Sequence, residues 1–114
     1  MSKDILFLLP KAFKDAKQPD KLFYCPHCLP IEGALSSYKD KLHELDVRYA
    51  DFPRPREEVI AIAGEDNQSL PLLVLGKGRT TSHKTGEYNG HQLVAGSAPI
   101  LAALAELYGI PVSH

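Results

Sequence analysis

Apolar residues gather in short segments of the chain, and their spacing predicts four strands. Two uninterrupted apolar runs, 4–9 and 70–75, have the length of strands that are buried on both faces. Alternation of apolar and polar residues over 47–52 predicts a further strand, which Pro53 ends. A short apolar segment over 91–94 predicts the last one.

Three other segments carry the signals of helices. Apolar residues spaced three and four apart predict one helix within 29–45. Acidic residues in the first turn predict a short helix over 56–63. Ser97 is expected to be the N-cap of a helix over 97–108, and Gly109 is expected to end it.

The remaining segments are polar. Residues 10–22 are expected to form an exposed loop, and 76–92, with its glycines, a long connection. The resulting order is strand, helix, strand, helix, strand, strand, helix. It predicts a single α/β domain over 1–114, in which a β-α-β unit and a β-β-α unit form a central mixed sheet flanked by helices.

The nearly balanced charge of the chain argues against some classes of binding partner. The chain has 114 residues, enough to bury a core, and a formal net charge of −1 from 13 basic and 14 acidic residues. No excess of Lys and Arg is available to replace phosphate counterions, so we expect neither a nucleic acid nor a membrane surface as partner. The apolar run 4–9 is too short to cross a membrane and no cleavage site follows it, so we expect a cytoplasmic protein.

The chemical feature of the chain is a pair of cysteines, in Cys25-Pro26-His27-Cys28, just before the first predicted helix. Unpaired N–H groups and the positive end of the helix dipole favour a thiolate there. Cys25 precedes the turn and is expected to be the nucleophile and the more exposed of the two thiols, with His27 as a cation or hydrogen-bond donor beside it. Cys28 can then attack a mixed disulfide and release the partner, so the two cysteines are expected to form a reversible disulfide.

The strand–CxxC–helix arrangement, with Leu70-Pro71 opening a later strand, resembles the thioredoxin/glutaredoxin superfamily. The resemblance implies a thioredoxin-like fold with a cis peptide bond before Pro71, opposite the dithiol. It implies that Leu70 offers backbone groups to a substrate. Gly96 and Ser97 resemble the place where glutaredoxins hold the γ-glutamyl carboxylate, so glutathione is a candidate substrate, and no cofactor is implied.

Two further comparisons refine this resemblance. The tetrapeptide around Pro26 is the version found in DsbA-like oxidants, which puts Pro26 beside the substrate. Over nearly the whole chain, the stretches 23–28, 51–56 and 68–71 are similar to an uncharacterised bacterial family of thioredoxin-like proteins, which brings no known function. Pro30 departs from the usual pattern and predicts that the regular helix begins near it.

Three functions follow as hypotheses. The first is thiol–disulfide exchange with a protein or a low-molecular-weight thiol or disulfide. The second is a non-catalytic interaction protein with the same fold. The third is a metal-binding protein in which His83 and His91 join the cysteines, although their spacing is wider than in zinc fingers. Arg54 and Arg56 are expected to be a solvated pair, and the sequence predicts no oligomeric state.

Overall fold

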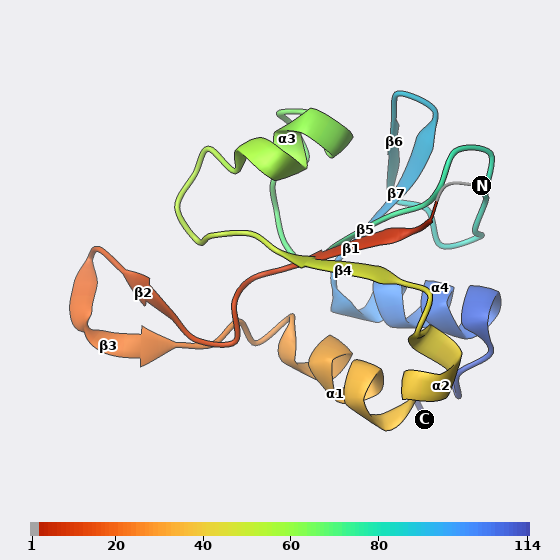
Figure 1. The fold of residues 1–114 in the computed structure, drawn as a ribbon, viewed down its shortest axis with the longest axis horizontal. Helices are drawn as coiled ribbons and strands as arrows, with labels where there is room; N and C mark the ends of the chain where they lie inside the picture. Colours follow the sequence, from red (N-terminus) through yellow and green to blue (C-terminus); the bar gives the residue numbers. More distant parts are fainter. Residues whose placement is uncertain (1–2) are drawn as a thin grey trace.

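The computed structural model describes residues 3–114, and its centre is a five-stranded sheet (Figure 1). The strands are β1 (Ile5–Leu8), β4 (Asp46–Tyr49), β5 (Leu72–Val74), β6 (Gly86–Tyr88) and β7 (His91–Ala95). Their order in the sheet is β4-β1-β5-β7-β6. Strand β1 is parallel to β4 and antiparallel to β5, while β7 is antiparallel to both β5 and β6. The predicted mixed sheet is confirmed.

Helices cover both faces of this sheet. They are α1 (Leu29–Ser37), α2 (Lys39–Leu42), α3 (Glu57–Ala63) and α4 (Ser97–Tyr108). Helices α1, α2 and α4 lie on one side of the sheet and α3 lies on the other (Figure 1). The molecule therefore has three layers, as the α/β class predicts.

The two layers of helices explain why the central strands read as continuous apolar runs. In β1, Leu6 and Leu8 belong to the larger core cluster, which also holds residues of α1 and α4. Phe7 belongs to the second cluster, with Val59 of α3. All of these side chains are fully buried, and each such burial stabilises the fold by about 1.5–3 kcal/mol. Both faces of the strand are covered, so neither face is polar.

The C-terminal helix has the bounds that the sequence predicts, with one correction at its start. Gly96, with φ 97°, is the N-cap residue, and Ser97 is the first residue of the helix. The prediction of Ser97 as the N-cap is therefore wrong by one position. The helix ends as predicted at Gly109, which adopts the left-handed conformation and donates its N–H to the carbonyl of Ala105 at 3.0 Å.

The expected loop over 10–22 is instead a hairpin of β2 (Phe13–Asp15) and β3 (Gln18–Phe23), which projects from the body of the protein (Figure 1). Strand β3 is exposed along most of its length, so it carries no alternation of apolar and polar residues. Its base is held by aromatic contacts. Phe13 pairs with Phe23 and stacks on Phe52, with ring centroids 4.7 Å apart.

The expected connection over 76–92 contains strand β6, which pairs with β7 through a tight turn. Asn89 and Gly90 form this turn with φ of 51° and 85°. Positive φ at two successive positions suits the right-handed twist of a two-residue hairpin, and Asn-Gly is its strongest sequence signal. The prediction of an irregular connection is wrong for 86–88, where a short edge strand pairs with β7.

The single helix expected within 29–45 is divided at Tyr38. The residue has φ −123° and ψ 43°, outside the helical range, and its N–H donates to the carbonyl of Ala34 at 2.9 Å. Two serines, Ser36 and Ser37, precede this point, and serine is a weaker helix former than alanine or leucine. At its other end α1 begins at Leu29 with proline in its first turn, as predicted.

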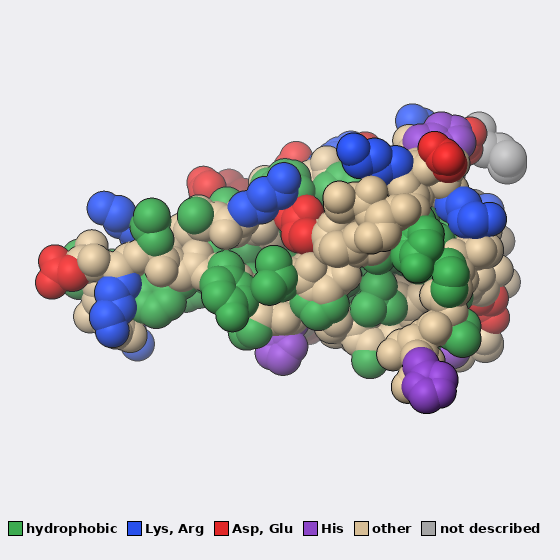
Figure 2. Space-filling view, turned by 90° about the horizontal axis from the view of Figure 1, so that it is seen from below, with side chains coloured by type: hydrophobic (Ala, Val, Ile, Leu, Met, Phe, Trp, Pro, Cys, Tyr) green, Lys and Arg blue, Asp and Glu red, His purple; other side chains and the backbone are tan. Residues whose placement is uncertain are grey.

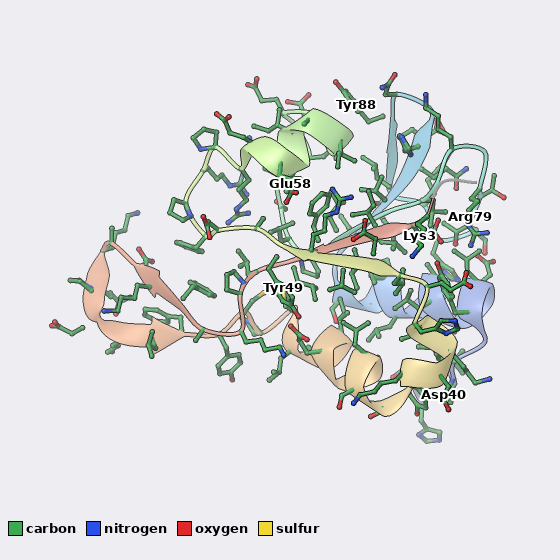
Figure 3. The ribbon with its side chains drawn as sticks, in the orientation of Figure 1. Lys3, Asp40, Tyr49, Glu58, Arg79 and Tyr88 are labelled. Atoms are coloured by element: carbon green, nitrogen blue, oxygen red, sulfur yellow. The ribbon has the colours of Figure 1, made fainter. Side chains whose placement is uncertain are left out.

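A buried carboxylate holds together the end of the sheet that lies away from the hairpin. Asp4 accepts hydrogen bonds from the N–H of Gly76 at 2.8 Å, from Nε of Arg79 at 2.9 Å and from the hydroxyl of Tyr108 at 2.5 Å. Arg79 marks this end in Figure 3. The contacts join the start of β1, the loop after β5 and the end of α4, and they leave the dithiol at the opposite end.

Candidate functional site

The dithiol lies in the turn that joins β3 to α1. The carbonyl of Cys25 accepts the N–H of Cys28 at 3.2 Å and that of Leu29 at 3.1 Å. Cys28 is the N-cap residue of α1, and its carbonyl accepts the N–H of Glu32 at 2.9 Å. Both cysteines are free thiols. The sequence therefore brings Cys25 and Cys28 together at a helix N-terminus, as expected.

The two thiols have different surroundings. The backbone N–H of Cys28 donates to Sγ of Cys25 at 3.2 Å. Burial, and next its hydrogen bond with Cys25, raise the pKa of the Cys28 thiol to about 12, although the backbone of Leu9 acts in the opposite direction. Cys28 is 3% exposed and Cys25 is 8% exposed. Cys28 therefore keeps its proton at neutral pH, while an amide dipole points at the sulfur of Cys25.

We expect iodoacetamide near neutral pH to alkylate Cys25 before Cys28, as measured by peptide mass spectrometry after short reaction times. The reason is that only the thiolate reacts, and its fraction falls about tenfold for each pH unit below the pKa. The rate at Cys28 should keep rising with pH throughout the alkaline range. In guanidinium, where the fold is lost, the two rates should become similar. Faster alkylation of Cys28 in the folded protein would reverse the assignment.

A small apolar pocket adjoins both thiols. Its volume is about 130 Å³, and its walls come from the end of β1, from the residue before Cys25 and from the start of α1; besides the cysteines it is lined by Leu9, Pro10, Lys11, Tyr24, Leu29 and Glu32. The carboxylate of Glu32 accepts a hydrogen bond at 2.9 Å from the hydroxyl of Tyr49, the last residue of β4, which Figure 3 labels. Burial and then this bond raise the pKa of Tyr49 to about 12. The Glu32 carboxylate thus already has a hydrogen-bond partner, and the pocket offers mainly apolar surface to a ligand.

A buried arginine lies near the dithiol. Arg56 is 8% exposed, and its guanidinium donates to the carbonyls of Asp51, Phe52 and Gln68, at 2.7 Å to each of the last two. Burial lowers its pKa, while the thiols, when charged, act in the opposite direction. The expectation of a solvated pair is therefore wrong for Arg56, although Arg54 is exposed.

The two residues between the cysteines are exposed. Pro26 and His27 both present their side chains to solvent in the turn. The structure thus places His27 beside the thiols, where the sequence predicts it, and leaves it accessible. Its role in tuning Cys25 stays a prediction.

The predicted substrate-binding residues form a second group. The Leu70–Pro71 peptide bond is cis, as the resemblance predicts. Leu70 packs against the core cluster that holds both cysteines, and the carbonyl of Pro71 accepts the N–H of Gly96 at 3.4 Å. Ser97 follows at the start of α4. The structure therefore brings these four residues to one region, but none of them lines the apolar pocket beside the thiols.

Two classes of site are absent from residues 3–114. No three His, Cys, Asp or Glu side chains come together there as a metal ion would require, so His83 and His91 do not join the cysteines. Within the same residues, no helix is both long and apolar enough to cross a membrane.

Comparison with known proteins identifies a family and no function. No curated protein and no solved structure matches the chain significantly. A family model described as "Protein of unknown function (DUF3088)" matches residues 3–112. This match confirms the expected membership of an uncharacterised family. The chain therefore belongs to the DUF3088 family of proteins of unknown function.

Proposed function

We propose that this protein is a thiol–disulfide oxidoreductase of thioredoxin-like fold, with Cys25 as nucleophile and Cys28 as resolving thiol. The observation that carries the proposal is the asymmetry of the pair. Cys25 receives the amide N–H of Cys28 on its sulfur, whereas the pKa of the more buried Cys28 is raised to about 12. One thiol is thus prepared to attack, and the other is held protonated until the first has reacted.

The order of strands in the sheet supports the thioredoxin-like part of the proposal. So does the segment with the cis Leu70–Pro71 bond, called the proline loop below. The arrangement β4-β1-β5-β7, with β1 parallel to β4 and the other neighbours antiparallel, follows from one β-α-β unit and one β-β-α unit. The dithiol opens the helix of the first unit, and Leu70-Pro71 precedes the first strand of the second. Strand β6 and the hairpin β2–β3 are additions to this core.

The proposed exchange proceeds in two steps. The Cys25 thiolate attacks one sulfur of a substrate disulfide, so that a Cys25–substrate disulfide forms and the other substrate sulfur leaves as a thiolate. Cys28 then gives its proton to the departing thiolate and attacks Sγ of Cys25, which releases the second substrate thiol. The protein loses two electrons and the substrate disulfide gains them. The same steps in reverse oxidise a dithiol substrate.

The remaining residues receive roles within this proposal. Pro26 and His27 are exposed beside Cys25, where His27 can stabilise a thiolate. Leu70, Pro71, Gly96 and Ser97 are proposed to contact the substrate on the side of the proline loop. The substrate is a protein or a low-molecular-weight disulfide, glutathione disulfide included, and the chemistry needs no cofactor.

We expect mild oxidation to join Cys25 and Cys28, because both lie in one turn, where Sγ of Cys25 is 3.2 Å from the backbone nitrogen of Cys28 and the two thiols interact. Mass spectrometry of the protein treated with diamide should show the loss of two hydrogens, located in the peptide that holds both cysteines. Dithiothreitol should restore them. A protein that forms only intermolecular disulfides, or that keeps both thiols free, would contradict the proposal. The variant Cys28→Ser, which has no second thiol, is the control.

A further inference from the structure

We infer that the apolar pocket beside the dithiol, together with the basic hairpin β2–β3, selects polypeptide disulfides that carry an aliphatic side chain next to the reacting cysteine and acidic residues nearby. The inference rests on the proposed function and names its substrate class. It concerns a surface outside the proline loop, formed by the end of β1, the hairpin and the start of α1.

The pocket suits a single aliphatic side chain. It lies against both Cys25 and Cys28, so whatever fills it is placed at the reacting sulfurs. Its volume of about 130 Å³ leaves room for one side chain of the size of leucine or methionine. The walls are mainly apolar, and the carboxylate of Glu32 is engaged by Tyr49. An uncharged polar side chain would lose water there against mainly apolar walls.

Large apolar side chains are exposed around the pocket. Tyr24 and Leu29, which line it, are 59% and 53% exposed, and Leu22 at the end of β3 is more exposed still. Figure 2 shows hydrophobic side chains gathered where the hairpin meets the body of the protein. Such a cluster, rimmed by charged residues, is typical of a surface that binds another polypeptide.

The charge of the hairpin indicates the kind of polypeptide. The segment 11–21 carries two aspartates against four lysines, which are Lys11, Lys14, Lys17 and Lys21. Asp15 is occupied by the backbone N–H of Lys17 at 2.9 Å, and in residues 3–114 no carboxylate forms an ion pair with any of the four lysines. Basic side chains are visible along the projecting end in Figure 2. The hairpin is thus locally positive although the chain as a whole is not, and it complements acidic residues.

The backbone of the hairpin favours an extended partner. Strands β2 and β3 pair only with each other, so the other edge of β3 has backbone groups without a neighbouring strand. This strand leads directly into Cys25. A substrate segment that pairs along β3 is therefore directed toward the dithiol, and main-chain hydrogen bonds add affinity that does not depend on sequence.

Glutathione is the competing class of substrate. It has carboxylates that Lys11 can attract, but no aliphatic side chain to fill the pocket and no chain long enough to follow β3. The inference therefore predicts that glutathione reacts more slowly than a suitable peptide, and that the difference depends on the pocket.

The test uses four peptides, each joined through its single cysteine to thionitrobenzoate. They carry either leucine or serine next to the cysteine, and either glutamates or lysines further along. The reduced protein attacks the peptide sulfur, and the released thionitrobenzoate is followed in a stopped-flow instrument. We expect leucine to react roughly tenfold faster than serine, in line with the selectivity of apolar pockets. We expect the glutamate peptides to react faster than the lysine peptides, by a factor that shrinks as salt is added.

Variants assign each preference to its surface. Leu29→Ser should bring the ratio of leucine to serine rates close to one, whereas Val112→Ser, at an exposed position outside the pocket, should leave this ratio unchanged. Lys14→Glu with Lys17→Glu should reverse the preference for glutamate, and Lys41→Glu in α2 is the matched control. Equal rates for leucine and serine, or a ratio that Leu29→Ser does not change, would overturn the inference. Exchange with glutathione–thionitrobenzoate would then still support the proposed function, and failure with all disulfides would remove both.

Discussion

Replacing Cys25 with serine is expected to lower the rate of disulfide exchange by roughly a thousandfold or more, because the nucleophile itself is lost. Replacing Cys28 with serine should have a different effect. The first step remains, since Cys25 is still present, but the mixed disulfide cannot be resolved. Incubation with a disulfide substrate should therefore leave Cys28→Ser with one substrate molecule attached at Cys25, as measured by intact-protein mass spectrometry.

The two serine variants are matched controls for each other, since each removes one sulfur from the same turn. Circular dichroism should show that both keep the fold. Trapping at Cys28 in the variant Cys25→Ser, with none at Cys25 in the variant Cys28→Ser, would exchange the two roles. Equal trapping in both would mean that the asymmetry of the pair does not determine the order of reaction.

Replacing Arg56 with methionine is expected to lower the free energy of unfolding by about 3 kcal/mol or more. The side chains are similar in length, but methionine donates no hydrogen bond. The partly buried carbonyls of Phe52 and Gln68 would lose their 2.7 Å partners, and a group left unsatisfied away from water costs about 1–3 kcal/mol. The measurement is urea denaturation followed by circular dichroism.

The matched control for this variant is Arg54→Met, two residues earlier in the chain. Arg54 is exposed, and its guanidinium donates to the hydroxyl of Ser69 at 3.3 Å. We expect Arg54→Met to change the free energy of unfolding by no more than about 0.5 kcal/mol, as is usual for surface substitutions. Similar losses for the two variants would show that charge near the loop matters rather than the buried hydrogen bonds of Arg56.

The parts of the fold that were predicted from the sequence are those whose local pattern agrees with their burial. Strands β1 and β5 read as apolar runs because helices cover both faces, and α4 has both an apolar face and Gly109 at its end. The hairpin β2–β3 was not predicted. Its residues are polar and exposed, and it is held by backbone pairing and by the contact of Phe13 with Phe52, which lies far away in the sequence. Local periodicity does not report such contacts.

The site shows the same division. Cys25 and Cys28 lie close together in the sequence, just before a segment with the apolar spacing of a helix. Their position at a helix N-terminus was therefore predicted. The burial of Arg56 and the pocket were not, because each depends on segments that only the fold brings together. The carbonyl partners of Arg56 come from two loops, and the pocket combines residues from the end of β1 with residues from the start of α1. No spacing within the sequence indicates the burial of Arg56 or the position of the pocket.

The most direct test of the account is an equilibrium redox titration of the purified protein. The protein is equilibrated in mixtures of reduced and oxidised dithiothreitol and, for more oxidising potentials, of reduced and oxidised glutathione; the free thiols are then alkylated and the masses are measured. The account predicts one two-electron transition between a form with two free thiols and a form with the Cys25–Cys28 disulfide, and no internal disulfide in Cys28→Ser. A protein whose two thiols remain free across the whole range of mixtures would contradict it.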